Sequence, residues 1–363
     1  MPKDTDAWTP TTHPERRRSA TDRRQSRRDD SLDIAKGFGI IFVVLGHCLD
    51  GLKSSGYFPP ELSWPTLAIY LIYLFHMPLF FVVSGHLASG KHRPVRATLT
   101  KLLTTIVYPY FLWSILAGLA LVRLSNYTNN QPPISSLYHI LWAPIVPYWF
   151  LYALFFCHLW YLAIRKLSHR VQMVIAVAVF LAPLLLARYI PLMNVPIVFE
   201  TVRGFLYFVL GVVSVAQVRQ FGRWTAIAAT ILFLLFATVF YQSQLGGAYG
   251  VIAVLPAAIS GIVATLAWSR MFAGVHGRFA RALALTFVFL GRYSMSIYVM
   301  HIFFTAGFRI ALKRLAFTPS AATTILEIAG ATVLGVALPL GINWIVSKFD
   351  LDTWFGLQHM ETS

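Results

Sequence analysis

The sequence predicts an all-α, polytopic membrane protein with about ten transmembrane helices and cytoplasmic N- and C-termini. Of its 363 residues, 57% are hydrophobic and only 12% are charged, whereas a soluble domain typically has about 25% charged residues. The apolar residues form repeated blocks of about 17–25, the length that a helix needs to cross a bilayer. Turn-forming segments rich in Pro, Gly and Asn separate these blocks, for example at residues 57–60 and 129–133.

Each apolar block predicts one helix. The predicted helices lie at about residues 34–52, 67–87, 104–123, 147–163, 171–187, 199–217, 224–241, 249–268, 282–306 and 323–346. The pattern is least regular over 188–203, where Pro191 and Pro196 interrupt it. Cys48 and Cys157 both fall within apolar runs, so we expect small buried side chains and no disulfide.

The basic residues predict the orientation. The net charge is +16, and eight of the 30 Lys and Arg residues precede Ser31 in a tail with almost no apolar residues. With that tail in the cytoplasm, 21 basic residues fall in inner segments and only six in outer segments, as the positive-inside rule requires. The positive charge therefore faces anionic headgroups, and we expect membrane lipids and no nucleic acid as partners.

The charge and hydropathy pattern divides the chain into three parts. Residues 1–30 form a disordered basic cytoplasmic tail, 31–347 a transmembrane domain and 348–363 a short cytoplasmic tail. The basic tail is too long for a signal peptide and no small-residue cleavage pattern follows, so the first helix stays as an anchor. We find no internal repeat of the kind that builds transporters from paired halves, and expect no soluble catalytic domain at either end.

Lys36 and His47 stand on the first predicted helix. Eleven positions separate them, so at about 100° per residue they project from nearly one face, about 16 Å apart along the axis. Ionisable groups inside a bilayer usually face a protein interior or a wet cavity. The pair suggests an anionic cofactor that is held at the inner surface and reaches inward to a base. Equally, His47 could be a buried histidine that bonds a backbone carbonyl.

Two features near His47 have two readings each. Asp50 lies one turn beyond His47 and could fix the tautomer of the imidazole, or it could simply end the helix at the outer surface. Gly37, Gly39 and Gly46 permit close helix packing, and they could also leave room for a thin ligand arm.

Further polar or aromatic groups lie inside the predicted spans. His76 precedes Pro78, which kinks its helix and frees a carbonyl near residue 74; this predicts either a pocket wall or a packing kink. Trp149 lies in an aromatic run that could form an interfacial belt or a platform for a sugar ring. Glu200 and Arg203, one turn apart, are predicted to pair.

The later spans carry the remaining ionisable groups. Arg292, near the inner end of its helix, could meet phosphate. His301 lies deeper, toward the outer half, and Glu327 is a buried acid to which we assign no role. No metal-binding spacing, Gly-rich nucleotide motif or P-loop is present in the sequence, so we predict no metal site.

The chain resembles the membrane-bound acyltransferase 3 family, in its branch of fucose 4-O-acetylase-like and polysaccharide O-acetyltransferases. The resemblance covers about residues 31–346 and is carried, in family order, by segments 33–47, 75–85, 108–113, 149–151 and 290–301. The first two segments together are specific to the family. The family motif places an arginine before its essential histidine with ten intervening positions; here Lys36 holds that place and His47 is the histidine. Lysine keeps the charge but loses the bidentate fork, and this form looks like the fucose-acetylase branch.

The resemblance implies a ten-helix, inner-membrane O-acyltransferase. Its donor would be cytoplasmic acyl-CoA, with acetyl-CoA expected, and its acceptor a hydroxyl of an extracytoplasmic glycan or lipid-linked sugar. Some relatives carry an extracytoplasmic hydrolase-like domain that is not evident here, so the acceptor would bind within the membrane domain or with a partner. The predicted roles are catalytic for His47 and Asp50, cofactor-binding for Lys36 and Arg292, and substrate-binding for His76, Trp149 and His301.

Two other functions remain open from the sequence. A proton-coupled transporter or flippase for a lipid-linked sugar or small anion could use His47, His76 and His301 as a proton relay. Such a transporter should show a broken helix at the midplane and paired halves. The chain could also be a scaffold subunit of a polysaccharide export complex, although Lys36 and His47 argue mildly against that.

Overall fold

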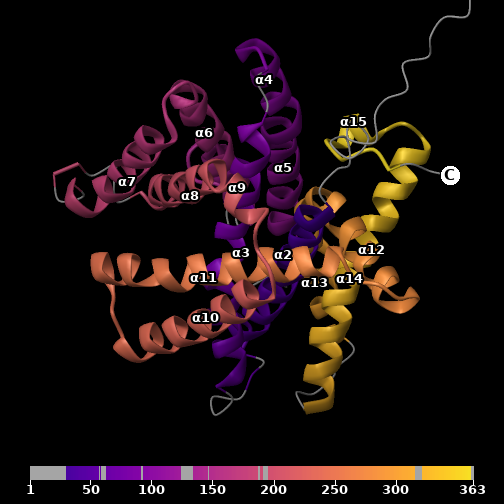
Figure 1. Ribbon diagram of the computed structural model, residues 1–363. Coiled ribbons are helices and arrows are strands. Elements are labelled where there is room, and N and C mark those ends of the chain that lie inside the picture. Colours follow the sequence, from indigo (N-terminus) through magenta and orange to yellow (C-terminus); the bar gives the residue numbers. More distant parts are fainter. Residues whose placement is uncertain are drawn as a thin grey trace, which may run out of the picture.

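The fold is entirely helical over the part of the chain that the structure describes, as predicted (Figure 1). The structure is a computed structural model, and it describes residues 30–56, 58, 63–90, 93–123, 134–145, 147–186, 189–190, 195–314 and 321–360. The basic tail up to residue 29, Pro191 and the loop 124–133 lie outside the described residues, so the predictions about them are untested.

Ten apolar helical segments correspond to the ten predicted spans. They are α2 (Asp30–Ser54), α3 (Trp64–Ser89), the continuous run of α4 (Val95–Leu102), η1 (Leu103–Val107) and α5 (Tyr108–Arg123), α6 (Trp149–Ile164), α7 (His169–Leu186), α8 (Pro196–Val213), α10 (Arg223–Ser243), α11 (Gly247–Ala273), α13 (Ser294–Arg314) and α14 (Ala321–Lys348). Within the described residues, nine are long and apolar enough to cross a membrane, and the 16-residue α6 is shorter. The prediction of a polytopic all-α membrane protein is confirmed.

Four short or amphipathic elements connect these spans. They are η3 (Ile134–Leu141), α9 (Val215–Val218), α12 (Arg278–Arg292) and α15 (Asp352–Phe355). The predicted helix over 282–306 is divided between α12 and α13, with Tyr293 as the C-cap of α12. The division has a physical reason: α12 carries Arg278 and Arg281 in its first turn, so it packs one face on α2 while the more apolar α13 makes the span.

The helix α2 is central and packs against α3, α11, α12, α13 and α14. Two glycines allow its approach to α12: a Cβ at Gly37 would strike the Phe287 carbonyl, and a Cβ at Gly291 would strike the Asp33 carbonyl. Gly39 and Gly46 likewise face side chains of α3. The glycines of α2 therefore serve close helix packing and leave no open channel for a ligand arm at these positions.

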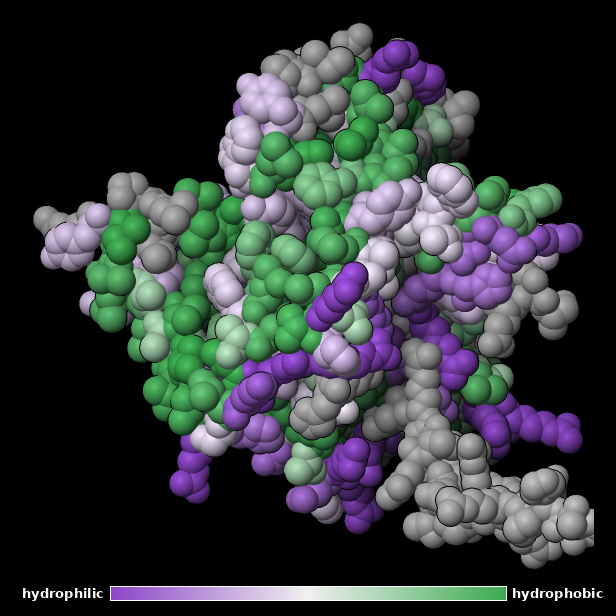
Figure 2. All heavy atoms as spheres, turned by 90° about the horizontal axis from the view of Figure 1, so that it is seen from above, coloured by the Kyte–Doolittle hydropathy of each residue, from purple (hydrophilic) through white to green (hydrophobic). Residues whose placement is uncertain are grey.

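The molecule has a buried core and an apolar outer surface. Ile40, Leu79 and Ile297 are completely buried between the inner helices. Large apolar side chains are exposed on the peripheral helices α7, α10 and α14, as expected of lipid-facing surfaces. Figure 2 shows hydrophobic groups over much of one face, with hydrophilic groups gathered toward the centre and right of the view. Cys48 and Cys157 are buried and unbridged, as predicted.

Candidate active site

Lys36 and His47 line two different cavities along the same helix. The helix α2 is continuous from Asp30 to Ser54, so the expected separation of about 16 Å along the axis holds. Lys36 lines a cavity of about 460 Å³, and His47 lines another of about 650 Å³. We call them the inner and the outer cavity, after the membrane orientation that the basic residues predict. Each ionisable group therefore lines a cavity within the protein, while the roles predicted for Lys36 and His47 stay predictions.

The inner cavity is strongly cationic. Lys36, Arg93, Lys101 and Arg165 line it, and no Asp or Glu is among its described lining residues. A hydrogen bond of 3.0 Å from the Arg165 guanidinium to the Arg93 carbonyl ties the end of α6 to the segment before α4. Sequence reasoning used Arg93, Lys101 and Arg165 only to orient the chain. The signal that could have found them was their shared position at the inner ends of the predicted spans.

Asp33, at the start of α2, lies close to two basic side chains. Its carboxylate lies 2.7 Å from the Lys36 ammonium and 3.7 Å from the Arg292 Nε. Arg292 also lies 3.6 Å from Asp30, and its side chain is 46% exposed. Arg292 is absent from the described lining of the inner cavity. The structure therefore places Arg292 where it joins α12 to the beginning of α2, beside the predicted phosphate site but outside its wall.

Four of the seven predicted site residues come together in the outer cavity. His47 and Asp50 of α2, His76 of α3 and Trp149 of α6 all line it. Sequence reasoning did not anticipate that Tyr73 would join them, or that α8 would contribute a wall. That wall carries an ion pair between Glu200 and Arg203, which forms as predicted.

Backbone carbonyls fix the protons of two histidines near this cavity. The Nδ1 of His76 lies 2.8 Å from the Ile72 carbonyl oxygen, and the Nδ1 of His301 lies 2.7 Å from that of Tyr298. A carbonyl can only accept, so each Nδ1 carries a proton and donates it to the carbonyl. His76 and Pro78 both line the outer cavity, which is the pocket-wall reading of this kinked segment.

His301 packs against the ring of His47 and does not itself line any of the three described cavities. Its ring centroid is 5.3 Å from that of His47, its side chain is completely buried, and it is absent from the described lining of the three cavities. Its Nε2 has no hydrogen-bond partner among the described residues. The structure thus puts His301 against the imidazole of His47, whereas the sequence had suggested contact with substrate.

His47 also borders a third cavity, of about 370 Å³. Asp50 lines it as well, together with Arg309 of α13 and Glu327 of α14. Glu327 is the buried acid to which the sequence analysis assigned no role. The described residues show no hydrogen bond between the Asp50 carboxylate and the His47 ring, so the orienting role of Asp50 stays a prediction. Asp50 does not end its helix, because α2 continues to Ser54.

The inner and outer cavities have two lining residues in common. Met77 of α3 and Tyr298 of α13 line both of them. The Tyr298 hydroxyl donates a hydrogen bond to the Pro147 carbonyl, and its ring centroid lies 6.2 Å from that of His301. Both side chains therefore border the cationic inner cavity and also the cavity that holds His47.

Comparison with known proteins agrees with this arrangement. A family model described as an acyltransferase domain matches residues 29–344. The chain belongs to the acyltransferase 3 family. The resemblance seen in the sequence is thereby confirmed, and with the apolar helices it identifies a multi-pass membrane protein. The match ends inside α14, so residues 345–360 lie beyond the acyltransferase 3 domain.

Two curated proteins are similar to part of the chain. Nodulation protein NolL of Sinorhizobium fredii (strain NBRC 101917 / NGR234) is 30% identical over 188 residues, which are 50% of this chain and 49% of that protein. Nodulation protein NolL of Mesorhizobium japonicum is 29% identical over 177 residues, 45% of this chain and 43% of that protein. The chain thus spans about half the length of the curated relatives it matches. No solved structure gives a significant match.

Proposed function

We propose that this acyltransferase 3 protein transfers an acyl group from cytoplasmic acyl-CoA to a hydroxyl of an extracytoplasmic glycan or lipid-linked sugar. The acyl group that we propose is acetyl. One observation carries the proposal. A cationic cavity and a histidine-lined cavity lie along α2 and have Met77 and Tyr298 as common lining residues. That arrangement suits a donor with an anionic head and a thin reactive arm. The enzyme would reside in the cytoplasmic (inner) membrane.

The donor would enter from the cytoplasmic side. Lys36, Arg93, Lys101 and Arg165 would surround its phosphates, and charge-assisted hydrogen bonds to phosphate are among the stronger ones in proteins. The pantetheine arm would pass Met77 and Tyr298 toward His47. The length is adequate, because about 16 Å along α2 is about the reach of an extended pantetheine. Acetyl-CoA acts here as a substrate, and the proposal requires no metal.

His47 would carry the chemistry. As a general base it takes the proton of the acceptor hydroxyl while that oxygen attacks the thioester carbonyl. The carbon–sulfur bond then breaks, and the leaving thiolate receives the proton from the imidazolium to give free CoA. Alternatively, the imidazole itself attacks the thioester and passes the acetyl group on from an acetyl-histidine. His301 packs against the His47 ring, and because its own Nδ1 donates to a carbonyl, its Nε2 is the ring nitrogen left to interact with His47.

The acceptor would bind in the outer cavity. Trp149 offers an apolar face of the kind on which sugar rings stack, and the pair of Glu200 and Arg203 offers hydrogen-bond acceptors and donors for hydroxyls. His76 lines the same cavity, and because its Nδ1 bonds the Ile72 carbonyl, its Nε2 is the ring nitrogen left for an acceptor hydroxyl. The outer loops at 53–66 and 124–146, much of which lies outside the described residues, complete the expected glycan contacts.

The experiment that tests this function follows radiolabelled acetyl-CoA in membranes that contain the protein. We expect label in glycan or lipid-linked sugar with the wild-type chain, and a loss of about 10²–10⁴-fold with His47→Ala, the range of general acid–base catalysis. His276→Ala is the matched control, because His276 is exposed in the turn between α11 and α12. Equal labelling by His47→Ala would remove His47 from catalysis. Intact protein that labels no acceptor would instead favour the transporter.

A further inference from the structure

The end of the chain folds back onto the inner cavity. After α14 ends at Lys348, residues 349–360, here called the C-terminal strap, pass through α15 and a turn at Gly356. Gln358 of the strap lines the inner cavity together with Lys36 and Arg165. In Figure 1 α15 lies between the upper ends of α5 and α14. A segment beyond the matched acyltransferase 3 domain thus contributes to the wall of the proposed donor site.

Hydrogen bonds from α5 hold the first half of the strap. The Tyr108 hydroxyl donates to the Trp354 carbonyl at 2.6 Å, and the Trp113 indole donates to the Phe355 carbonyl at 3.0 Å. Gly356 follows with φ of +61°, a left-handed conformation that favours glycine. These contacts fix the direction in which the chain leaves α15.

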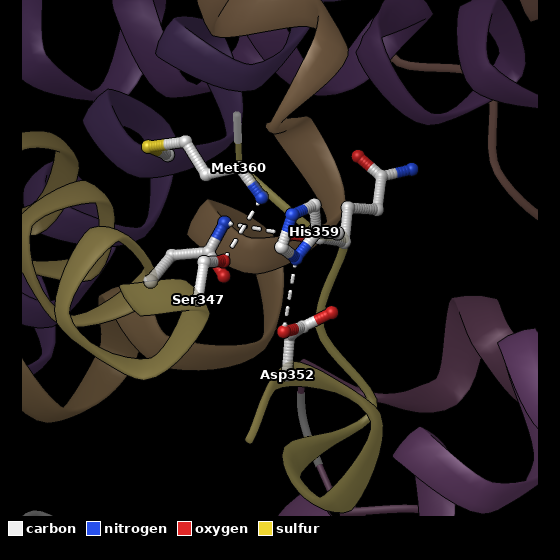
Figure 3. Close-up of polar contacts among 6 residues, drawn as sticks. Ser347, Asp352, His359 and Met360 are labelled. Carbon is white, nitrogen blue, oxygen red and sulfur yellow. Dashed lines mark hydrogen bonds and ion pairs between the residues drawn. The ribbon is translucent and has the colours of Figure 1, made fainter. Parts of the chain in front are cut away.

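Hydrogen bonds from α14 hold the second half. The Asn343 side-chain amide donates to the Gln358 carbonyl at 3.1 Å, and the Met360 backbone N–H donates to the Ser347 hydroxyl at 2.9 Å. Within the strap, the His359 Nδ1 lies 3.2 Å from the Asp352 carboxylate. Figure 3 shows the Met360–Ser347 and His359–Asp352 contacts closing this end of the chain. The backbone of Gln358 is therefore anchored directly.

The residues around Gln358 lock its position further. Leu357 and Met360 are buried, with 8% and 5% exposure, while Gln358 itself is exposed at the cavity. A side chain on a fixed backbone binds a ligand at a lower entropic cost than one on a free chain end. The strap thus has the rigidity that a binding segment needs.

We propose that the C-terminal strap completes the donor site and that the Gln358 side chain binds the nucleotide part of the CoA donor. Gln358 is the one carboxamide among the described lining residues of the inner cavity. The neighbouring cations suit phosphate, whereas a carboxamide offers both donors and an acceptor, the pattern that pairs with the edge of adenine. The inference rests on the proposed function, because it assumes a CoA thioester in the inner cavity.

The test compares two donors with wild-type protein, Gln358→Ala and a matched control. Acetyl-CoA carries the nucleotide, and acetyl-pantetheine lacks the nucleotide and its phosphates. For Gln358→Ala we expect the KM for acetyl-CoA to rise about threefold to tenfold, the value of one hydrogen bond, with kcat unchanged. The reaction with acetyl-pantetheine should not change. Gln217→Ala removes an exposed carboxamide on α9, outside the cavity, and should behave as wild type with both donors.

Binding of CoA to purified protein gives a second readout that does not require turnover. Gln358→Ala should weaken CoA binding by the same factor, while its thermal unfolding matches that of wild type. An unchanged KM and Kd for Gln358→Ala in active protein would overturn the inference alone. An equal rise in KM for both donors would also overturn it, since the strap would then act through the fold. Wild-type protein that uses neither donor would instead contradict the proposed function.

Discussion

Lys36 has two electrostatic environments: it pairs with Asp33 on its own helix and faces the cationic cavity. Asp33 is 2% exposed and lies 2.7 Å from the Lys36 ammonium. Removing one partner of a buried pair costs about 3–5 kcal/mol where the remaining charge is left uncompensated. Arg292, 3.7 Å from the Asp33 carboxylate, would compensate part of that charge here. A loss of activity on deleting Lys36 therefore combines two effects, lower stability and weaker donor binding.

Separate measurements of stability and of donor affinity distinguish these two effects. We expect Lys36→Ala to lower the unfolding temperature and to raise the KM for acetyl-CoA at least about tenfold. Lys36→Arg keeps the positive charge beside Asp33 and should retain both stability and donor binding. Thermal unfolding in detergent and steady-state kinetics measure the two quantities. Normal acetyl-CoA kinetics in Lys36→Ala would contradict a donor site in the inner cavity.

Trp149 distinguishes a sugar platform from an interfacial belt. We expect Trp149→Ala to raise the KM for the acceptor by about fivefold to tenfold, because stacking on an aromatic face is worth about 1–1.4 kcal/mol. The KM for acetyl-CoA should stay the same, and Trp149→Phe should recover most of the loss. The exposed Trp344 on α14 offers the control Trp344→Ala. If both alanine variants only reduce the amount of folded protein, Trp149 belongs to the belt.

The sequence could predict the parts of the site that share one helix. The alignment of Lys36 and His47 follows from helical geometry alone, and the pairing of Glu200 with Arg203 follows from their spacing. The lining that Met77 and Tyr298 give to both cavities depends on how α3 and α13 pack, for which a single sequence has no signal. The same holds for His301, whose position behind His47 is a tertiary contact.

Among the elements, α3 and α8 cross at two glycines. A Cβ at Gly85 would strike the Phe208 carbonyl, and a Cβ at Gly211 would strike the Val82 carbonyl. Because these obstacles are backbone atoms, the helices themselves would have to separate. The α3–α8 crossing also positions His76 and the Glu200–Arg203 pair on facing walls of the outer cavity.

We therefore expect Gly211→Val to destabilise the fold. Overpacking typically costs about 1–3 kcal/mol, and the unfolding temperature in detergent should fall by several degrees with a loss of acceptor affinity. Gly341→Val on α14 is the control, since a Cβ there meets no atom within 4 Å. Equal stability of the two variants would contradict the close α3–α8 crossing.

Element bounds show what hydropathy can and cannot predict. The predicted spans at 34–52 and 67–87 lie within α2 and α3 and differ by a few residues at each end. The break at Tyr293 was missed because no proline marks it and apolar runs flank it on both sides. The polar stretch from Gly291 to Ser294 and the arginines in the first turn of α12 were the signals that this segment does not continue α13.

At the scale of the whole molecule, the proposed mechanism requires that the two cavities open to opposite sides of the membrane. With cytoplasmic acyl-CoA as the proposed donor, the cationic cavity would have to open to the cytoplasm and the cavity around His47 toward the other side. Only the acyl group would then cross, while CoA would leave by the side from which it came. The 21-to-6 distribution of basic residues predicts this orientation.

Thiol labelling tests that orientation directly. Cys48 and Cys157 are buried, so the unmodified chain should give little background. We expect Ser243→Cys, exposed at the end of α10, to react with a membrane-impermeant maleimide in intact cells, because that end is predicted to face outward. Gln217→Cys, exposed on α9 at the predicted inner face, should react only after permeabilisation. The reverse pattern would put the cationic cavity outside the cell, where no acyl-CoA could reach it, and would contradict the proposed direction of transfer.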